Sequence, residues 1–147
     1  EVFSSEEMLY VPIENFNIHF KGFVDAVVKV GDTYHLFDWK TCSWGWDSRR
    51  KAEKLVTYQL TLYKHFFCQK HKIDPKNVET HFALLKRTAK KDRVEIFRVT
   101  SGKKKTENAL KLLYQAIYNI SKRFHIKNRL ACAKPYPCKL YNTEHCP

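Results

Sequence analysis

The sequence predicts an α/β domain in which helices flank a mixed β-sheet. Three observations support this fold class: segments rich in β-branched side chains, a tight-turn dipeptide between two of them, and an apolar stripe at helical spacing near the C-terminus. The expected order is three strands, a helix, two strands and a second helix. With 147 residues, of which 44% are hydrophobic and 14% aromatic, the chain is able to form a core. We predict a single domain over residues 1–147, with an irregular tail rich in cysteine and proline over residues 131–147.

Three strands are expected in the first part of the chain. Residues 9–20 alternate loosely, with a break at Pro12, and residues 22–30 are rich in β-branched side chains. The Gly31–Asp32 dipeptide is typical of a tight turn, so residues 33–41 are expected to return as the partner strand. This hairpin is the strongest turn signal in the sequence.

A helix and two more strands follow. Ser48 is expected to cap a helix that runs to about Lys70, and the segment 73–77, with its proline, ends that helix. Strands are expected at residues 78–85 and 93–99, joined by a very basic turn.

The second helix is expected to begin at Thr106, which is a suitable capping residue. Its apolar residues recur at helical spacing and form one stripe: Leu110, Leu113, Ile117, Ile120 and Phe124. Such a stripe predicts a helix that packs on the sheet.

The predicted hairpin brings two carboxylates together. With a two-residue turn at Gly31–Asp32, Asp25 lies directly opposite Asp38, and strand alternation places Lys40 on the same face. Two like charges about 4.5–5.5 Å apart at Cβ are destabilising, so a compensating cation is needed. Oxygen ligands favour Mg²⁺ or Mn²⁺ over Zn²⁺. Lys40 is then placed to orient or deprotonate a water beside the metal.

The opposite face of the hairpin is expected to enter the core through five apolar residues: Val24, Ala26, Val28, Phe37 and Trp39. An alternative interpretation is a solvent-facing strand with two incidental aspartates and a lysine salt bridge. A three-residue turn would also break the argument, because it would place the carboxylates on opposite faces.

The helix after the hairpin carries Gln59 and Tyr63 one turn apart on the same face. An amide and a phenol hydroxyl on one stripe suit contact with phosphate or the orientation of a catalytic lysine. The ordinary alternative is an amphipathic helix with Leu55, Leu62 and Phe66 in the core and polar residues at its margin.

Three motifs in this order resemble the PD-(D/E)XK nuclease superfamily. They are Gly-x-x-Asp on one strand (Gly22–Asp25), Asp-x-Lys on the next (Asp38–Lys40) and Gln-x-x-x-Tyr on the following helix (Gln59–Tyr63). The third motif resembles the RecB-like exonuclease branch, which includes the CRISPR-associated adaptation nucleases and the mitochondrial genome-maintenance exonuclease. The matched stretch covers a little under a third of the chain.

The resemblance implies a restriction-endonuclease-like core and metal-dependent hydrolysis of DNA, of the kind used in DNA repair and recombination. Asp25 and Asp38 would bind one or two Mg²⁺ or Mn²⁺ ions, with the backbone carbonyl of Trp39 as a further ligand. Lys40 would position or activate the attacking water, while Gln59 and Tyr63 would support Lys40 and the DNA backbone. Two alternatives remain: a restriction-like or structure-selective endonuclease on the same core, and an inactive nucleic-acid-binding module.

The chain departs from the family pattern in two places. Relatives usually carry a His or Glu ligand on an upstream helix, and no helix-length segment precedes the first expected strand here. Glu7 is a candidate substitute; the alternatives are that this ligand has been lost or that it comes from a residue outside these 147. Some relatives also bind a 4Fe–4S cluster through one upstream cysteine and three late ones. Cys132, Cys138 and Cys146 resemble the late trio, but no cysteine precedes Asp25 and their spacing is loose. Cys42 or Cys68 would have to complete such a site, and free thiols are the preferred interpretation.

The balance of charge indicates a polyanionic partner. The chain has 27 Lys and Arg against 15 Asp and Glu, a formal charge of +12, which favours a nucleic acid over a merely soluble basic surface. Trp44 and Trp46 are candidates for stacking on bases of single-stranded or end-bearing DNA, with core packing as the alternative. The turn with Lys86, Arg87 and Lys90 is a candidate phosphate contact, with a solvated charge run as the alternative.

Cysteine usage and hydropathy indicate the compartment. Five cysteines are an odd number for a disulfide framework, and the first residues are polar rather than typical of a signal peptide. No apolar run approaches the roughly 18 residues of a membrane span. We therefore expect an intracellular location, in the cytoplasm or a DNA-containing organelle, and no membrane partner.

Overall fold

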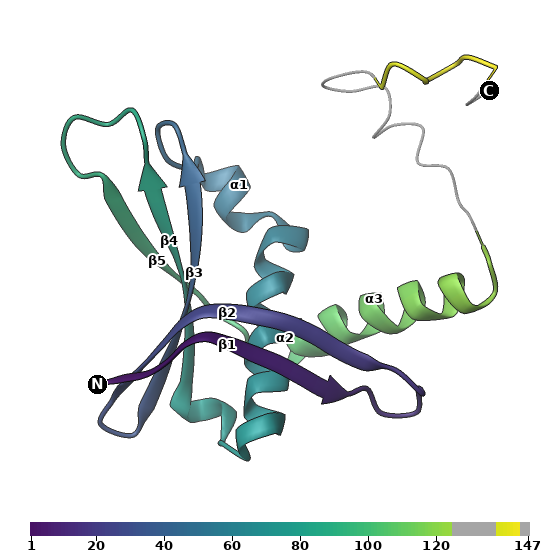
Figure 1. Ribbon diagram of the computed structural model, residues 1–147, viewed down its shortest axis with the longest axis horizontal. Helices are drawn as coiled ribbons and strands as arrows, with labels where there is room; N and C mark the ends of the chain where they lie inside the picture. The colour runs from purple at the N-terminus through teal and green to yellow at the C-terminus, as the bar shows by residue number, and fades with distance from the viewer. Residues whose placement is uncertain (125–137, 145–147) are drawn as a thin grey trace. The chain divides into compact units, whose positions relative to one another are not determined.

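A five-stranded mixed sheet organises the N-terminal part of the computed structural model, which describes residues 1–124 and 138–144 (Figure 1). The strands lie in sequence order across the sheet, and β3 pairs with β4 in parallel while the other neighbours are antiparallel. The strands are β1 (Val2–Pro12), β2 (His19–Val30), β3 (Thr33–Cys42), β4 (Val78–Lys86) and β5 (Val94–Val99). This mixed α/β arrangement is the predicted fold class and is consistent with a restriction-endonuclease-like core.

Helical segments connect the two parallel strands, and one further helix comes after the last strand in the chain. A parallel pair needs a crossover, and here the crossover contains α2, which comes after β3 and before β4 in the chain and lies against the sheet (Figure 1). The helical segments are α1 (Ser48–Ala52), α2 (Lys54–His71), the short 3₁₀ helix η1 (Pro75–Asn77) and α3 (Lys103–Ser121).

Two predicted helix starts need correction. Asp47, not Ser48, caps α1, because its carboxylate accepts a 2.8 Å hydrogen bond from Arg50 N. The helix is also divided at Glu53 into α1 and α2. At the other helix, α3 begins before Thr106, whose backbone N–H donates to Gly102 O at 3.0 Å and so belongs to the first helical turn.

The first predicted strand is wrong in its bounds. Residues 9–20 include a turn, because Pro12 ends β1 and Asn15 adopts a positive φ of 65°. The backbone N–H of Ile13 donates to Ile18 O at 3.0 Å and closes this turn before β2. The pair β1 and β2 therefore forms a long hairpin in place of one broken strand (Figure 1).

The tight turn at Gly31 and the register of the second hairpin are confirmed. Val30 pairs with Thr33 and Ala26 pairs with Phe37, as a two-residue turn requires. Gly31 has a φ of +57°, a conformation that glycine adopts without strain. Asp25 and Asp38 lie one residue beyond the last pair of this ladder.

The predicted core face of the hairpin is wrong for most of its residues. Val24 is fully buried, but Ala26, Val28 and Phe37 are only half-buried and Trp39 is 44% exposed. The fully buried face instead carries Leu36 and Val27.

The helix α2 explains this outcome. Its Leu60 belongs to a buried cluster with Phe82 and Leu84, which pair with Asp38 and Lys40 of β3 and so share their face. Leu55, which the amphipathic alternative placed in the core, is 68% exposed, whereas Phe66 is buried against Phe20 in a stacked pair at 4.1 Å. The site residues thus lie under the crossover helix.

Two compact units make up the chain, Glu1–Lys111 and Leu112–Pro147. The first contains the sheet, and the second contains the later part of α3. On α3, Leu110, Leu113 and Ile117 of the predicted stripe are half-buried, while Ile120 is 75% exposed. Among the described residues, none of the helices has the length and apolar composition needed to cross a membrane. The prediction of a single domain with an irregular tail stays a prediction.

Three of the five cysteines fall on described residues, and all three are free thiols: Cys42, Cys68 and Cys138. Cys68 is buried and Cys138 is exposed. Cys132 and Cys146, the other members of the late trio, lie outside the described residues.

Candidate active site

Asp38 is the central buried acid of the sheet. Only 3% of the residue is exposed, because α2 covers its face of β3. Its Oδ1 accepts a hydrogen bond from Gln59 Nε2 at 2.8 Å, and its Oδ2 lies 2.6 Å from Lys40 Nζ in an ion pair. Three of the predicted site residues are therefore in direct contact.

Asp25 joins this group through the backbone of β3. Its Oδ2 accepts a 2.7 Å hydrogen bond from Trp39 N, the amide next to Asp38. The two acids are close enough for the charge of Asp25 to raise the pKa of Asp38. Asp25 therefore lies near Asp38 at the end of the hairpin ladder, and their direct pairing across the strands stays a prediction. A ligand role for the carbonyl of Trp39 stays a prediction.

The environment of Asp38 disfavours its charge. Burial is the largest effect and raises the pKa of Asp38 above its usual 3.8, while the hydrogen bond and charge of Lys40 act in the opposite direction. The nearby Asp25 raises it further. A buried carboxylate whose single cationic partner does not restore its normal pKa is a place where a further cation stabilises the charged form.

Gln59 and Tyr63 form a short hydrogen-bonded chain on α2. Gln59 Nε2 donates to Tyr63 Oη at 3.2 Å as well as to Asp38 Oδ1. Gly22 of β2 lies directly under the Tyr63 ring: a Cβ at Gly22 would approach Tyr63 Cε1 to 2.8 Å. The glycine in the first motif is therefore needed for the close approach of α2 to β2.

The donor set fits a hard divalent cation. Asp38 Oδ2 is buried, and its close partner among the described residues is Lys40 Nζ at 2.6 Å. A carboxylate oxygen has a second lone pair, which is available for a metal, and Asp25 supplies a second carboxylate. Oxygen ligands of this kind suit Mg²⁺ or Mn²⁺.

Glu7, the candidate substitute ligand, is held elsewhere. Its Oε1 accepts hydrogen bonds from Lys70 Nζ and His71 Nε2, both at 2.7 Å. Burial acts to raise the pKa of Glu7, but these two hydrogen bonds outweigh it and hold the pKa below its usual value. Glu7 thus attaches β1 to the C-terminal end of α2.

The two candidate stacking residues have different environments. Trp44 is 77% exposed, so its ring is accessible. Trp46 packs against Phe82 and Phe97, with ring centroids 5.3 and 6.0 Å away, and Arg50 covers it at 4.8 Å. Trp46 therefore has the core-packing role that was the alternative.

The basic turn lies beside the loop that follows Lys40. Arg87 N donates to Cys42 O at 2.8 Å and Thr88 N to Ser43 O at 3.2 Å. Arg87 and Lys90 are exposed, whereas Lys86 is half-buried with its Nζ 3.8 Å from Glu95. Arg87 and Lys90 are thus free to face a ligand at the end of the sheet where β3 and β4 terminate.

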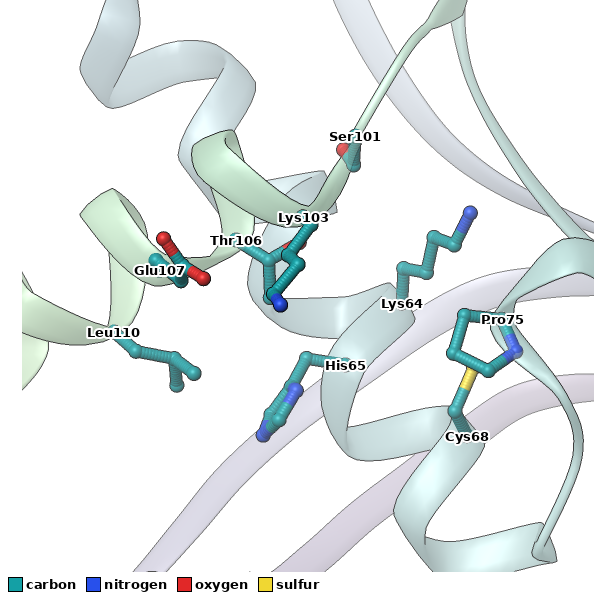
Figure 2. Close-up of a pocket in the computed structure, with 9 residues that line it drawn as sticks. All are labelled: Lys64, His65, Cys68, Pro75, Ser101, Lys103, Thr106, Glu107 and Leu110. Atoms are coloured by element: carbon teal, nitrogen blue, oxygen red, sulfur yellow. The ribbon is translucent and has the colours of Figure 1, made fainter.

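A pocket of about 380 Å³ lies apart from these acids, between α2 and the start of α3 (Figure 2). Its lining includes Lys64, His65, Cys68, Thr106 and Leu110. Burial raises the pKa of the Cys68 thiol to about 11, so this thiol is neutral at physiological pH and a poor nucleophile. The pocket contains none of the residues that contact Asp38.

One close group of titratable side chains was not predicted from the sequence. His35, Glu79 and His81 lie together on β3 and β4. The alternation Glu-x-His within one strand was the only local signal, and the third member depends on the pairing of strands distant in sequence.

Comparison with known proteins agrees with this fold. The family model of the PD-(D/E)XK nuclease superfamily matches residues 2–147. The crystal structure of SSO0001 is similar with a TM-score of 0.52 and 13% sequence identity, over 89% of this chain and 55% of that one. The chain thus spans about half the length of that protein, and the likeness concerns the fold alone. No curated protein matches the sequence. On the family match and the shared core, this chain belongs to the PD-(D/E)XK nuclease superfamily.

Proposed function

We propose that the chain is a metal-dependent deoxyribonuclease that acts on DNA ends. The observation that carries the proposal is the buried Asp38, held by Gln59, paired with Lys40 and adjacent to Asp25. Such a cluster is costly to fold without a cation, and family membership supplies the nuclease chemistry.

Each side chain has a defined task in this proposal. Asp25 and Asp38 hold one or two Mg²⁺ or Mn²⁺ ions, which when bound supply electrostatic stabilisation of the charge that develops on the phosphate. Gln59 fixes the Asp38 carboxylate through Oδ1 and leaves Oδ2 directed toward Lys40. Lys40 Nζ orients the attacking water as an ammonium, or accepts its proton as a neutral amine. Tyr63 accepts a hydrogen bond from Gln59, so its own hydroxyl proton is available for a phosphate oxygen.

The preference for an exonuclease rests on the Gln59–Tyr63 pair. This pair resembles the helix motif of RecB-like exonucleases, and its contact with Asp38 supports the same role here. The exposed Trp44 and the basic Arg87 and Lys90 are proposed to hold the strand. A structure-selective endonuclease on the same core is the second candidate.

The test is digestion of end-labelled linear single- and double-stranded DNA with Mg²⁺, beside covalently closed circular DNA. The parent is expected to shorten linear DNA from its ends and to leave the closed circle intact. Asp38→Asn and Lys40→Met are expected to lose activity, by about 10²–10⁴-fold for the lysine, as for removal of a general base. Asp32→Asn in the exposed turn is the matched control and retains activity.

Three outcomes would contradict parts of the proposal. Cleavage of the closed circle would show an endonuclease. DNA binding without cleavage under Mg²⁺ or Mn²⁺ would show an inactive binding module. Full activity of both Asp38→Asn and Lys40→Met would remove the assigned roles.

A further inference from the structure

A second group of metal-ligating side chains lies on the other face of the sheet. His35 of β3 is paired with Glu79 of β4, and His81 follows two residues later on the same strand. His35 Nδ1 lies 3.2 Å from His81 Nε2, and Glu79 Oε2 lies 3.6 Å and 3.7 Å from these two nitrogen atoms. One oxygen and two imidazole nitrogens therefore form a small triangle.

The alternation of β3 separates this triangle from the candidate active site. Leu36 and Asp38 point toward α2, so His35 and Phe37 point to the opposite face. The triangle shares no ligand with the Asp25 and Asp38 cluster, and its existence does not depend on the proposed nuclease mechanism.

We propose that His35, Glu79 and His81 bind a zinc ion. Zinc bonds to imidazole nitrogen and carboxylate oxygen are about 2.0–2.2 Å long, so two ligand atoms in a tetrahedral site lie about 3.3 Å apart. The three observed separations are close to this value. Two histidines with one carboxylate are a borderline nitrogen and oxygen set, which suits Zn²⁺ rather than Mg²⁺, and they leave a fourth position for water.

The surroundings hold the ligands in place. Arg98 Nη1 contacts Glu79 Oε1 at 3.0 Å, which fixes the carboxylate and leaves Oε2 directed at the histidines. Phe37 stacks on the His81 ring at 5.0 Å. All three ligands are half-buried on paired central strands, so the site needs little rearrangement.

The experiment is titration of the full chain, first treated with chelator, with Co²⁺ as a spectroscopic probe of tetrahedral geometry and then with Zn²⁺ as competitor. The parent is expected to bind one Co²⁺ with nitrogen and oxygen ligands and to release it to Zn²⁺. His35→Ala and His81→Ala are each expected to weaken binding by more than the roughly 10–100-fold typical of losing an outer contact. His65→Ala, a histidine on α2, is the matched control.

Two further variants exclude other sites. Asp38→Asn and a Cys132→Ser/Cys138→Ser/Cys146→Ser triple variant should both keep the His-dependent spectrum, because neither touches the triangle. In the parent, imidazole nitrogen resonances of two of the seven histidines should shift on Zn²⁺ binding. This measurement uses the parent alone, so it does not depend on whether the variants fold. An unchanged spectrum in His81→Ala, or Zn²⁺ binding that shifts no imidazole resonance, would show that the triangle is only a hydrogen-bonded histidine pair beside a glutamate.

Discussion

Asp38 illustrates how one residue can be unfavourable for folding and yet suited to binding a metal ion. Its carboxylate is buried beneath α2, and its partners do not restore an ordinary pKa. A raised pKa in the folded state means that the folded protein binds the proton more tightly than the unfolded chain. The contribution of Asp38 to stability is therefore fully present below pH 3.8 and is lost as the pH rises through the raised value.

This loss of stability with rising pH leads to a prediction for the metal-free protein. Asp38→Asn removes the buried charge, so at neutral pH in EDTA its midpoint of thermal unfolding should lie above that of the parent. The difference should shrink as the pH falls toward 3.8, where the parent carboxylate is protonated. Thermal unfolding followed by circular dichroism across this pH range measures it.

Asp32→Asn, in the exposed turn, is the control and should show no such pH dependence. A lower midpoint for Asp38→Asn than for the parent at neutral pH would mean that the ion pair with Lys40 outweighs the cost of burial. Added Mg²⁺ should raise the midpoint of the parent and of Asp32→Asn, but not that of Asp38→Asn.

At the scale of elements, the contact between β2 and α2 sets the geometry of the site. Gly22 permits Tyr63 to lie against the strand, and Tyr63 in turn accepts a hydrogen bond from Gln59. Gly22→Ala would place a methyl group 2.8 Å from a ring carbon and force α2 outward. We expect a loss of about 1–3 kcal/mol in the free energy of unfolding, as for overpacked cores, and a fall in nuclease activity.

Gly102→Ala is the matched control, because a Cβ there meets nothing within 4 Å. Denaturant unfolding gives the free energies of both variants. The double variant Gly22→Ala/Tyr63→Leu should recover stability but not activity, since the shorter side chain removes the clash together with the hydroxyl. Equal stability of Gly22→Ala and the parent would mean that α2 is not tightly seated on β2.

Local signals predicted some elements well and others poorly. The Gly31–Asp32 turn fixed the register of its hairpin, because turn length alone decides which residues face one another. The first strand was misjudged because Pro12 and Asn15 mark a turn that the loose alternation concealed. The predicted cap of the first helix was one residue too late, because Asp47 and Ser48 are both suitable capping residues. Only the hydrogen bond from Arg50 N to Asp47 distinguishes them.

The choice of sheet face required information that the hairpin does not contain. Phe37 and Trp39 are both large and aromatic, whereas Leu36 is followed on its face by the charged Asp38, so composition favoured the wrong face. The buried face is the one on which α2 packs, and Leu60 of α2 contacts Phe82 and Leu84 of β4 there. Asp38, Lys40 and Gln59 nevertheless come together, because Asp38 and Lys40 lie on the face that α2 covers and Gln59 is carried by α2.

At the scale of the whole molecule, the chain combines a net charge of +12 with a small acidic site. The backbone contacts of Arg87 and Thr88 attach the basic turn to the loop that follows Lys40, so Arg87 and Lys90 lie near the end of the sheet where β3 and β4 terminate. The zinc site we infer could not be predicted from local sequence, because His35 and His81 are 46 residues apart and meet only through the parallel pairing.

The position of the basic turn leads to a prediction about salt. Arg87→Gln/Lys90→Gln should weaken binding to single-stranded DNA and reduce the slope of log affinity against log salt by about 1.4, since each lost phosphate contact removes roughly 0.7. Fluorescence anisotropy with a labelled oligonucleotide over a salt series, without divalent metal, measures the slope.

Lys76→Gln/Lys72→Gln, at the opposite end of β4, changes the same net charge and is the control. If both pairs reduce the slope equally, the protein binds through its overall charge and not through the basic turn.

The parallel pairing of β3 with β4 also has a consequence for the order of events during folding. Asp25 and Trp39 are 14 residues apart, Asp38 and Gln59 are 21 apart, and the strand that completes their surroundings arrives only after the crossover. Contacts with long sequence separation close late, because loop entropy must be overcome first. A newly made chain therefore carries all of its basic residues before Asp25, Asp38 and Gln59 have come together. During refolding, nuclease activity should return with the β3–α2–β4 unit and lag behind the recovery of helix.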